Sequence, residues 1–184
     1  MEPTDKLTDE ERAQLLRTAR RTLEEHLASG QRLAVDASSP ALQQERGAFV
    51  TLHKHGRLRG CIGTFEAQGP LQETVQRMVI AAATTDPRFP TVTADELPQL
   101  DMEISVLSPL QAVSAEEIEV GTHGIFITRG GRRGVLLPQV ATDHGWDRET
   151  FLSHTCIKAG LPTSAWREPD TVIEAFSAEV FGEE

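Results

Sequence analysis

Residues 58–64 bring together a cysteine, an arginine and two glycines in a segment typical of a β-strand. Glycine weakens the interior of a strand, and it usually marks a bulge or a place where a ligand or another backbone comes close. Strand alternation predicts that Arg59 and Cys61 share one face, while Leu58 and Ile62 point to the other. Because a nearby positive charge favours the thiolate, Cys61 is a candidate nucleophile.

A thiol nucleophile needs a base within hydrogen-bond reach, and the sequence offers three without choosing among them. His53 lies on the strand expected to pair with residues 58–64, Glu103 on the polar face of another strand, and His123 in a distant turn. Glu103 would become a base with a raised pKa if its face of the strand were covered. The alternative for Cys61 is a structural thiol, because cysteine is among the most buried residue types. Cys156 lies on the apolar stripe of a helix and is assigned to the core.

A second set of residues could hold a small anionic ligand. Backbone N–H groups around Gly60 and Gly63, helped by Arg59, would form a concavity for an anion. Asp86 and Arg88 flank a proline, and Arg88 could bind a carboxylate or phosphate through two hydrogen bonds. Each has a structural alternative, since the glycines can mark a bulge and Asp86 with Arg88 can form a local turn or ion pair.

Length and composition restrict the class of protein. The 184 residues fit one domain, and the formal net charge of −10 argues against nucleic acid as a partner. No apolar run is long enough to cross a membrane, and the acidic N-terminus lacks a signal segment, so we expect a cytoplasmic protein. With two cysteines and no Cys/His spacing of a zinc site, neither a disulfide nor a metal site is expected.

The order of the expected elements indicates an α+β fold, with a mostly antiparallel sheet flanked by helices. Capping patterns and apolar spacing predict helices over 8–29, 70–85 and 147–159, with short turns after Thr93 and Ser114. Strands are expected at 48–53, 58–64, 100–106, 125–128 and 134–137, with a single terminal strand over 172–181.

Six segments in a fixed order resemble the AMMECR-type domain family, whose prokaryotic members are called AmmeMemoRadiSam system protein A. Each segment alone is weak, but the ordered set is specific and covers the chain from the first helix to Phe181. The matching segments are Leu58-Arg59-Gly60-Cys61-Ile62-Gly63, Asp86-Pro87-Arg88-Phe89-Pro90, residues 103–109, Gly121-Thr122-His123-Gly124, residues 136–140 and residues 156–162.

The resemblance implies a single AMMECR-type domain over residues 1–184, with a smaller lobe at about 57–99 that carries the Arg-Gly-Cys-Ile-Gly strand. It implies association with a MEMO-like protein and a radical-SAM enzyme, but no reaction and no cofactor. Two functions follow as expectations. The first is binding of a small anionic ligand, or chemistry on it, beside Cys61. The second is a non-enzymatic adaptor role for one of those partners.

Overall fold

The computed structural model describes residues 6–35 and 39–183, and the chain divides into two compact units. The first unit comprises residues 1–107 and 179–184, and the second comprises residues 108–178. Both units carry antiparallel sheets with helices, so the predicted α+β class is confirmed. The smaller lobe at about 57–99 stays a prediction, and its residues lie within the first unit.

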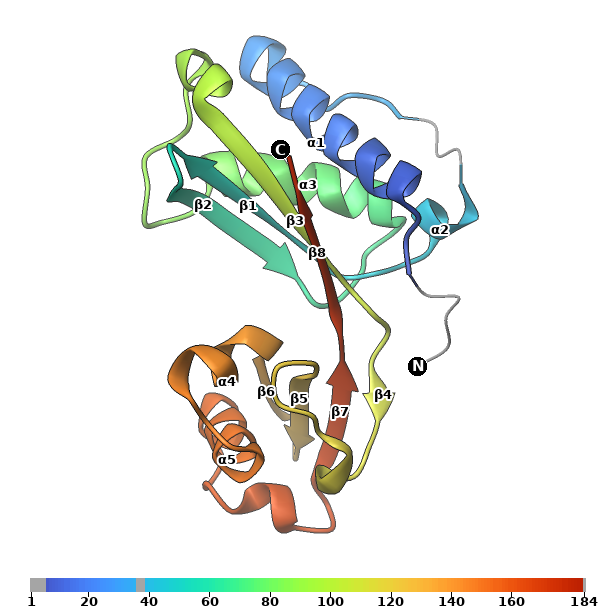
Figure 1. The fold of residues 1–184 in the computed structure, drawn as a ribbon, viewed down its shortest axis with the longest axis vertical. Helices are drawn as coiled ribbons and strands as arrows, with labels where there is room; N and C mark the ends of the chain where they lie inside the picture. The colour runs from blue at the N-terminus through green and yellow to red at the C-terminus, as the bar shows by residue number, and fades with distance from the viewer. Residues whose placement is uncertain (1–5, 36–38, 184) are drawn as a thin grey trace. The chain divides into compact units, whose positions relative to one another are not determined.

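The first unit has a four-stranded sheet in the order β2-β1-β3-β8, drawn in the upper half of Figure 1. Helices α1 and α3 pack against each other and against this sheet. The elements of the unit are α1 (Asp9–Ser29), α2 (Pro40–Gln43), β1 (Ala48–Lys54), β2 (Arg57–Thr64), α3 (Leu71–Thr84), the 3₁₀ helix η2 (Ala94–Gln99), β3 (Leu100–Leu107) and β8 (Ala178–Gly182).

Helix α1 begins where the sequence predicts, because Thr8 and Glu11 form a complete capping box. Its apolar stripe, which includes Leu15 and Leu23, is fully buried against the sheet and α3. Alternate residues of β1 and β3 complete this core, so each strand presents one face to the helices and the other face away from them. The buried strand residues are Ala48, Val50, Leu52, Met102, Ile104 and Val106.

The second unit contains the other four-stranded sheet, in the order β4-β7-β5-β6, with α5 packed on it. Its core includes Phe151, Leu152 and Cys156, all fully buried. The elements are β4 (Gln111–Ala112), the 3₁₀ helix η3 (Ala115–Glu117), β5 (Gly124–Arg129), β6 (Arg132–Leu136), α4 (Pro138–His144), α5 (Arg148–Lys158), the 3₁₀ helix η4 (Ala165–Arg167) and β7 (Val172–Phe176).

One expectation about elements was wrong, and one helix, α4, was not expected. The single terminal strand is interrupted at Ser177, so β7 pairs in the sheet of the second unit and β8 in the sheet of the first. Pro138 occupies the first position of α4, where its missing N–H costs no hydrogen bond. Among the described residues, no helix is long and apolar enough to cross a membrane.

Candidate functional site

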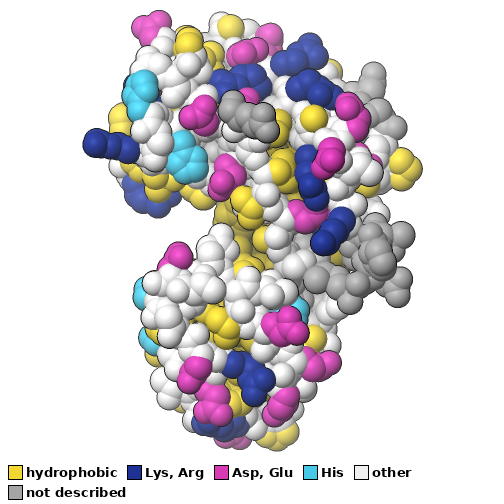
Figure 2. Space-filling view, viewed as in Figure 1, with side chains coloured by type: hydrophobic (Ala, Val, Ile, Leu, Met, Phe, Trp, Pro, Cys, Tyr) yellow, Lys and Arg dark blue, Asp and Glu magenta, His cyan; other side chains and the backbone are white. Residues whose placement is uncertain are grey.

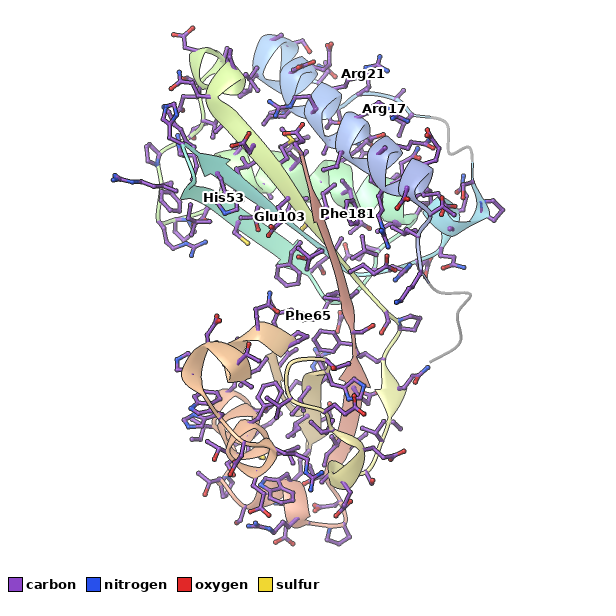
Figure 3. All side chains as sticks on the ribbon, in the orientation of Figure 1. Arg17, Arg21, His53, Phe65, Glu103 and Phe181 are labelled. Atoms are coloured by element: carbon purple, nitrogen blue, oxygen red, sulfur yellow. The ribbon has the colours of Figure 1, made fainter. Side chains whose placement is uncertain are left out.

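The face of the first sheet that points away from α1 and α3 carries four of the residues predicted to do chemistry, namely His53, Cys61, Gly63 and Glu103. We call it the thiol face. Strand pairing places its residues in three rows across β2, β1 and β3. The rows are Gly63–Phe49–Ser105, Cys61–Thr51–Glu103 and Leu58–His53–Asp101. Figure 3 labels His53 and Glu103, which lie near each other on this face.

The central row sets a thiol, a hydroxyl and a carboxylate side by side. The Thr51 hydroxyl donates a hydrogen bond to the Sγ of Cys61 at 3.2 Å. Glu103 faces Thr51 from the opposite strand, and directly opposed residues have Cβ atoms about 5 Å apart. Cys61 is partly exposed, whereas a structural thiol would be expected in the core as Cys156 is. A hydroxyl that donates to sulfur stabilises the thiolate, so this row has the parts of a nucleophile site.

Aromatic rings border the row on one side. The ring of Phe49 lies over Gly63, where a Cβ atom would come within 2.1 Å of it. Phe49 also meets Phe65 edge-to-face, with ring centroids 5.0 Å apart. The rings therefore form an apolar wall beside Cys61, and Gly63 is required because the ring needs the space of its missing side chain.

Simple alternation is wrong for residues 58–60, because β2 has a bulge at this point. His53 pairs with Leu58 and Leu52 pairs with Gly60, which leaves Arg59 as the extra residue. Leu58 consequently shares the face of Cys61 and is 40% exposed, while Ile62 packs against the core as predicted.

Arg59 makes a network of its own. Its guanidinium forms two hydrogen bonds with the carboxylate of Glu96, at 3.0 and 2.9 Å, and a third with the carbonyl of Pro90. Lys54 binds the same carboxylate at 2.9 Å. The Arg59 hydrogen bonds, with those from Lys54 and the N–H of Thr93, lower the pKa of Glu96 to about 2. The charge of Arg59 is thus already matched by Glu96, which weakens its predicted role toward an anion.

Asp86 and Arg88 cover the free edge of β2 at Cys61. The Asp86 carboxylate accepts the backbone N–H of Cys61 at 2.9 Å, and Arg88 Nη2 approaches the carbonyl of Cys61 at 3.4 Å. Arg88 and Asp86 are also joined by two side-chain hydrogen bonds. These bonds, above all the Arg88 side chain, hold the pKa of Asp86 far below its usual range. Asp86 and Arg88 thus bond the backbone N–H and carbonyl of Cys61, as a neighbouring strand would. This protects the edge of β2 from pairing with a strand of another molecule.

We expect Asp86→Ala to speed amide hydrogen exchange at Cys61 and to lower the midpoint of thermal unfolding, since the N–H of Cys61 would lose its acceptor. Exchange measured by mass spectrometry on the peptide that contains Cys61 tests this. Asp101→Ala is the matched control, because it removes an exposed carboxylate that has no bond among the described residues. Equal exchange in the two variants would show that Asp86 does not cap the strand.

The structure brings Arg88, Asp86, Thr51 and Glu103 to the strands around Cys61, but it places His123 in the second unit. There the backbone N–H of Glu119 donates to Nδ1 of His123 at 3.1 Å, which ties the imidazole into its own turn. The catalytic roles predicted for Cys61, Glu103 and His123 stay predictions, as does anion binding at Gly60 and Gly63. Thr51 escaped sequence analysis because the bulge shifts its partner by one residue.

No three His, Cys, Asp or Glu side chains cluster as a metal site within residues 6–35 and 39–183. Both cysteines are free thiols. The thiol face carries one thiol, with hydroxyl, carboxylate, imidazole and guanidinium groups as neighbours.

Comparison with known proteins identifies the family. The AMMECR1 family model matches residues 16–181, which include every strand of the thiol face. The chain belongs to the AMMECR1 family. A protein from Methanothermobacter thermautotrophicus is 44% identical over 97% of each chain, and Protein MJ0810 from Methanocaldococcus jannaschii is 40% identical over 96% of this chain and 92% of its own.

The AMMECR1 assignment agrees with a solved structure. The crystal structure of uncharacterized protein PH0010 from Pyrococcus horikoshii is 40% identical and superposes with a TM-score of 0.79, covering 92% of this chain and 90% of its own. Family membership, predicted from six ordered motifs, is therefore confirmed.

Proposed function

We propose that this AMMECR1 protein binds a small ligand on the thiol face and presents Cys61 to it as a nucleophile. The observation that carries the proposal is the row Cys61–Thr51–Glu103, in which a hydroxyl donates to a partly exposed sulfur and a carboxylate lies on the next strand. Glu103 is the general base of this arrangement. Glu103 lies on β3, two strands from Cys61 with Thr51 between them, so its action as a base needs one bridging group between the carboxylate and the thiol.

Arg88 is the cation that would meet an anionic part of the ligand. Its side chain is 55% exposed, and its Nη1 makes no hydrogen bond within the described part of the chain. Its pKa is raised, mainly by the hydrogen bond to Asp86. Arg88 Nη2 lies 3.4 Å from the carbonyl of Cys61, so a ligand held by Arg88 would lie beside the thiol.

Alkylation of the native protein tests the proposal, and the chain supplies its own control. Iodoacetamide at pH 7 should modify Cys61 but leave Cys156, which is fully buried and whose thiol pKa is raised by that burial. Thr51→Val should slow modification of Cys61 by about threefold to tenfold, because the donor to sulfur is lost. Thr51→Ser keeps the hydroxyl and should react like the unaltered protein. Rates follow from peptide mass spectrometry.

Two results would contradict the proposal that Cys61 is a nucleophile. One is a Cys61 that stays unmodified until the protein is denatured, and the other is an equal rate in Thr51→Val and Thr51→Ser. Glu103→Gln tests the base separately, since loss of a base changes the pH dependence of the alkylation rate and loss of packing alone does not.

An adaptor role is the second candidate, and it is favoured by one observation. Leu58 is 40% exposed on the thiol face, where an apolar side chain could contact another protein. Leu58→Asp should then abolish co-elution with a MEMO-like or radical-SAM protein on a sizing column, while Glu24→Ala on α1, which packs on the other face of the sheet, should not. An absence of co-elution by the unaltered chain would reject this role.

A further inference from the structure

A second candidate site lies on α1, away from the thiol face. Helix α1 and residues 33–35 line an open cavity of about 270 Å³ on the surface. That volume lies near the lower end of small-molecule sites, which span about 300–1,000 Å³. Figure 3 shows Arg17 and Arg21 one turn apart on this helix, and Figure 2 shows basic side chains gathered over the same part of it. The lining residues are Gln14, Arg17, Thr18, Arg21, Leu33, Ala34 and Val35.

The buried side chain of Gln76 forms a hydrogen bond with the segment that makes the outer wall of this cavity. The amide of Gln76, on α3 and 1% exposed, donates to the carbonyl of Leu33 at 2.7 Å. The same amide nitrogen donates to the hydroxyl of Thr22 on α1 at 2.9 Å. Gln76 therefore links α3, α1 and the segment that carries Leu33, so the cavity has walls held by hydrogen bonds from the core.

Among the described residues, one of the two arginines that line the cavity has no carboxylate partner. Arg21 makes no ion pair or hydrogen bond to any described residue, and Arg17 meets only the exposed Glu10, at 2.7 Å. Exposed pairs of that kind contribute little. Two like charges four residues apart on a helix destabilise it, so an anion between Arg17 and Arg21 would be stabilising. The concentration of positive charge stands out in a chain of net charge −10.

The cavity also contains a hydroxyl group that lacks a partner. Thr18 lies between the two arginines in sequence, lines the cavity and is 8% exposed. Its hydroxyl forms no hydrogen bond with any described residue, whereas Thr84 and Thr85 bond the carbonyl four residues earlier in α3. The Thr18 hydroxyl is therefore available to a polar group that enters the cavity.

We infer that this cavity binds the phosphate group of a small phosphorylated molecule. Arg17 and Arg21 supply the charge and the planar N–H groups that suit a phosphate, and Thr18 supplies one further hydroxyl. The partly buried Leu33 and Val35 offer an apolar surface for the rest of the ligand. The inference does not depend on Cys61 or on any chemistry at the thiol face.

Titration with inorganic phosphate at constant ionic strength tests the site, with the midpoint of thermal unfolding as the readout. Phosphate should raise the midpoint more than chloride does, and Arg21→Ala should weaken the apparent affinity by about tenfold or more. Arg57→Ala is the matched control, since it removes an exposed arginine that has no bond among the described residues and changes the net charge equally. Thr18→Val should weaken binding by a smaller factor.

Two outcomes would overturn the inference. The first is a midpoint that responds to phosphate no more than to chloride. The second is an equal response in Arg21→Ala and Arg57→Ala, which would show that phosphate acts on the overall charge of the protein. A phosphate monoester with an apolar group, titrated in the same way, should bind more tightly than inorganic phosphate if Leu33 and Val35 contact the ligand.

Discussion

Replacing Gly60 by alanine should lower the free energy of unfolding by about 3 kcal/mol, which is the upper part of the range for overpacked cores. A Cβ atom at this position would lie 2.2 Å from the carbonyl oxygen of Ala82 and 3.1 Å from its carbonyl carbon. Both atoms belong to the backbone of α3, so no side-chain rotation can make room. The helix would have to move away from β2, and the core that includes Val79 and Ala82 would open with it.

Gly63→Ala is the matched comparison, because the obstruction there is a side chain. The new Cβ would lie 2.1 Å from the ring of Phe49, which can be removed. Phe49→Ala should therefore abolish most of the cost of Gly63→Ala and none of the cost of Gly60→Ala. Urea unfolding followed by far-ultraviolet circular dichroism gives these free energies. Similar coupling of both glycine variants to Phe49→Ala would contradict this account.

This pair of glycines shows what sequence reasoning can deliver. Glycine inside a strand correctly indicated a bulge or a close approach, and both occur in β2. The sequence could not say which one Gly60 serves, because Ala82 is 22 positions away and meets it only after α3 packs on the sheet. The local sequence pattern showed that Gly60 and Gly63 are structurally constrained. Only the tertiary packing shows which atoms constrain each of them.

The bulge also explains the main error about the site. Period-two alternation holds only while both strands advance by one residue at each pair, and β2 inserts Arg59 without a partner. Leu58 was therefore assigned to the core face although it lies on the thiol face. Thr51, the hydroxyl partner of Cys61, would have been placed opposite Gly60 by an unbroken hairpin.

Contacts of charged side chains with residues distant in the sequence could likewise not be predicted from local sequence patterns. Asp86 and Arg88 do form the local ion pair that turn chemistry suggested, but their cover of the β2 edge depends on a strand 25 residues earlier. Glu96 completes a capping box with Thr93 in the short turn expected there. The ion pairs of Glu96 with Arg59 and Lys54 form only because η2 lies against the hairpin of β1 and β2. The spacing of residues in the sequence does not predict that contact.

The prediction of one strand over residues 172–181 was wrong for a related reason. Apolar and polar residues alternate over residues 172–181 as they do in a single strand. Strand propensity does not show that the chain leaves the sheet of the second unit at Ser177 and that β8 then pairs in the sheet of the first. The division at residues 107 and 179 likewise depends on which strands pair rather than on any linker composition. Strand pairing is a non-local property, so it was the least predictable part of this fold.

The second large effect is expected for Glu96→Gln, which should cost about 2 kcal/mol at pH 7. The pKa of Glu96 falls from 4.5 to about 2 in the folded protein, chiefly through the Arg59 side chain. A shift of this size corresponds to roughly 3 kcal/mol, and solvent screening at the partly exposed Lys54 reduces it. Glutamine keeps an oxygen for the N–H of Thr93, so the variant removes the charge and retains the cap.

The pH dependence gives the sharper test of this pair. Because folding lowers the pKa of Glu96, its contribution is complete above about pH 4.5 and is lost as the pH falls toward 2. The stability of Glu96→Gln should therefore approach that of the unaltered protein as acid is added, and the two should meet near pH 2. Asp95→Asn is the control, since it removes an exposed neighbouring carboxylate that has no ion pair among the described residues. A difference between Glu96→Gln and the unaltered protein that stays constant from pH 7 to pH 2 would show that packing, and not the charge held by Arg59 and Lys54, is what the carboxylate contributes.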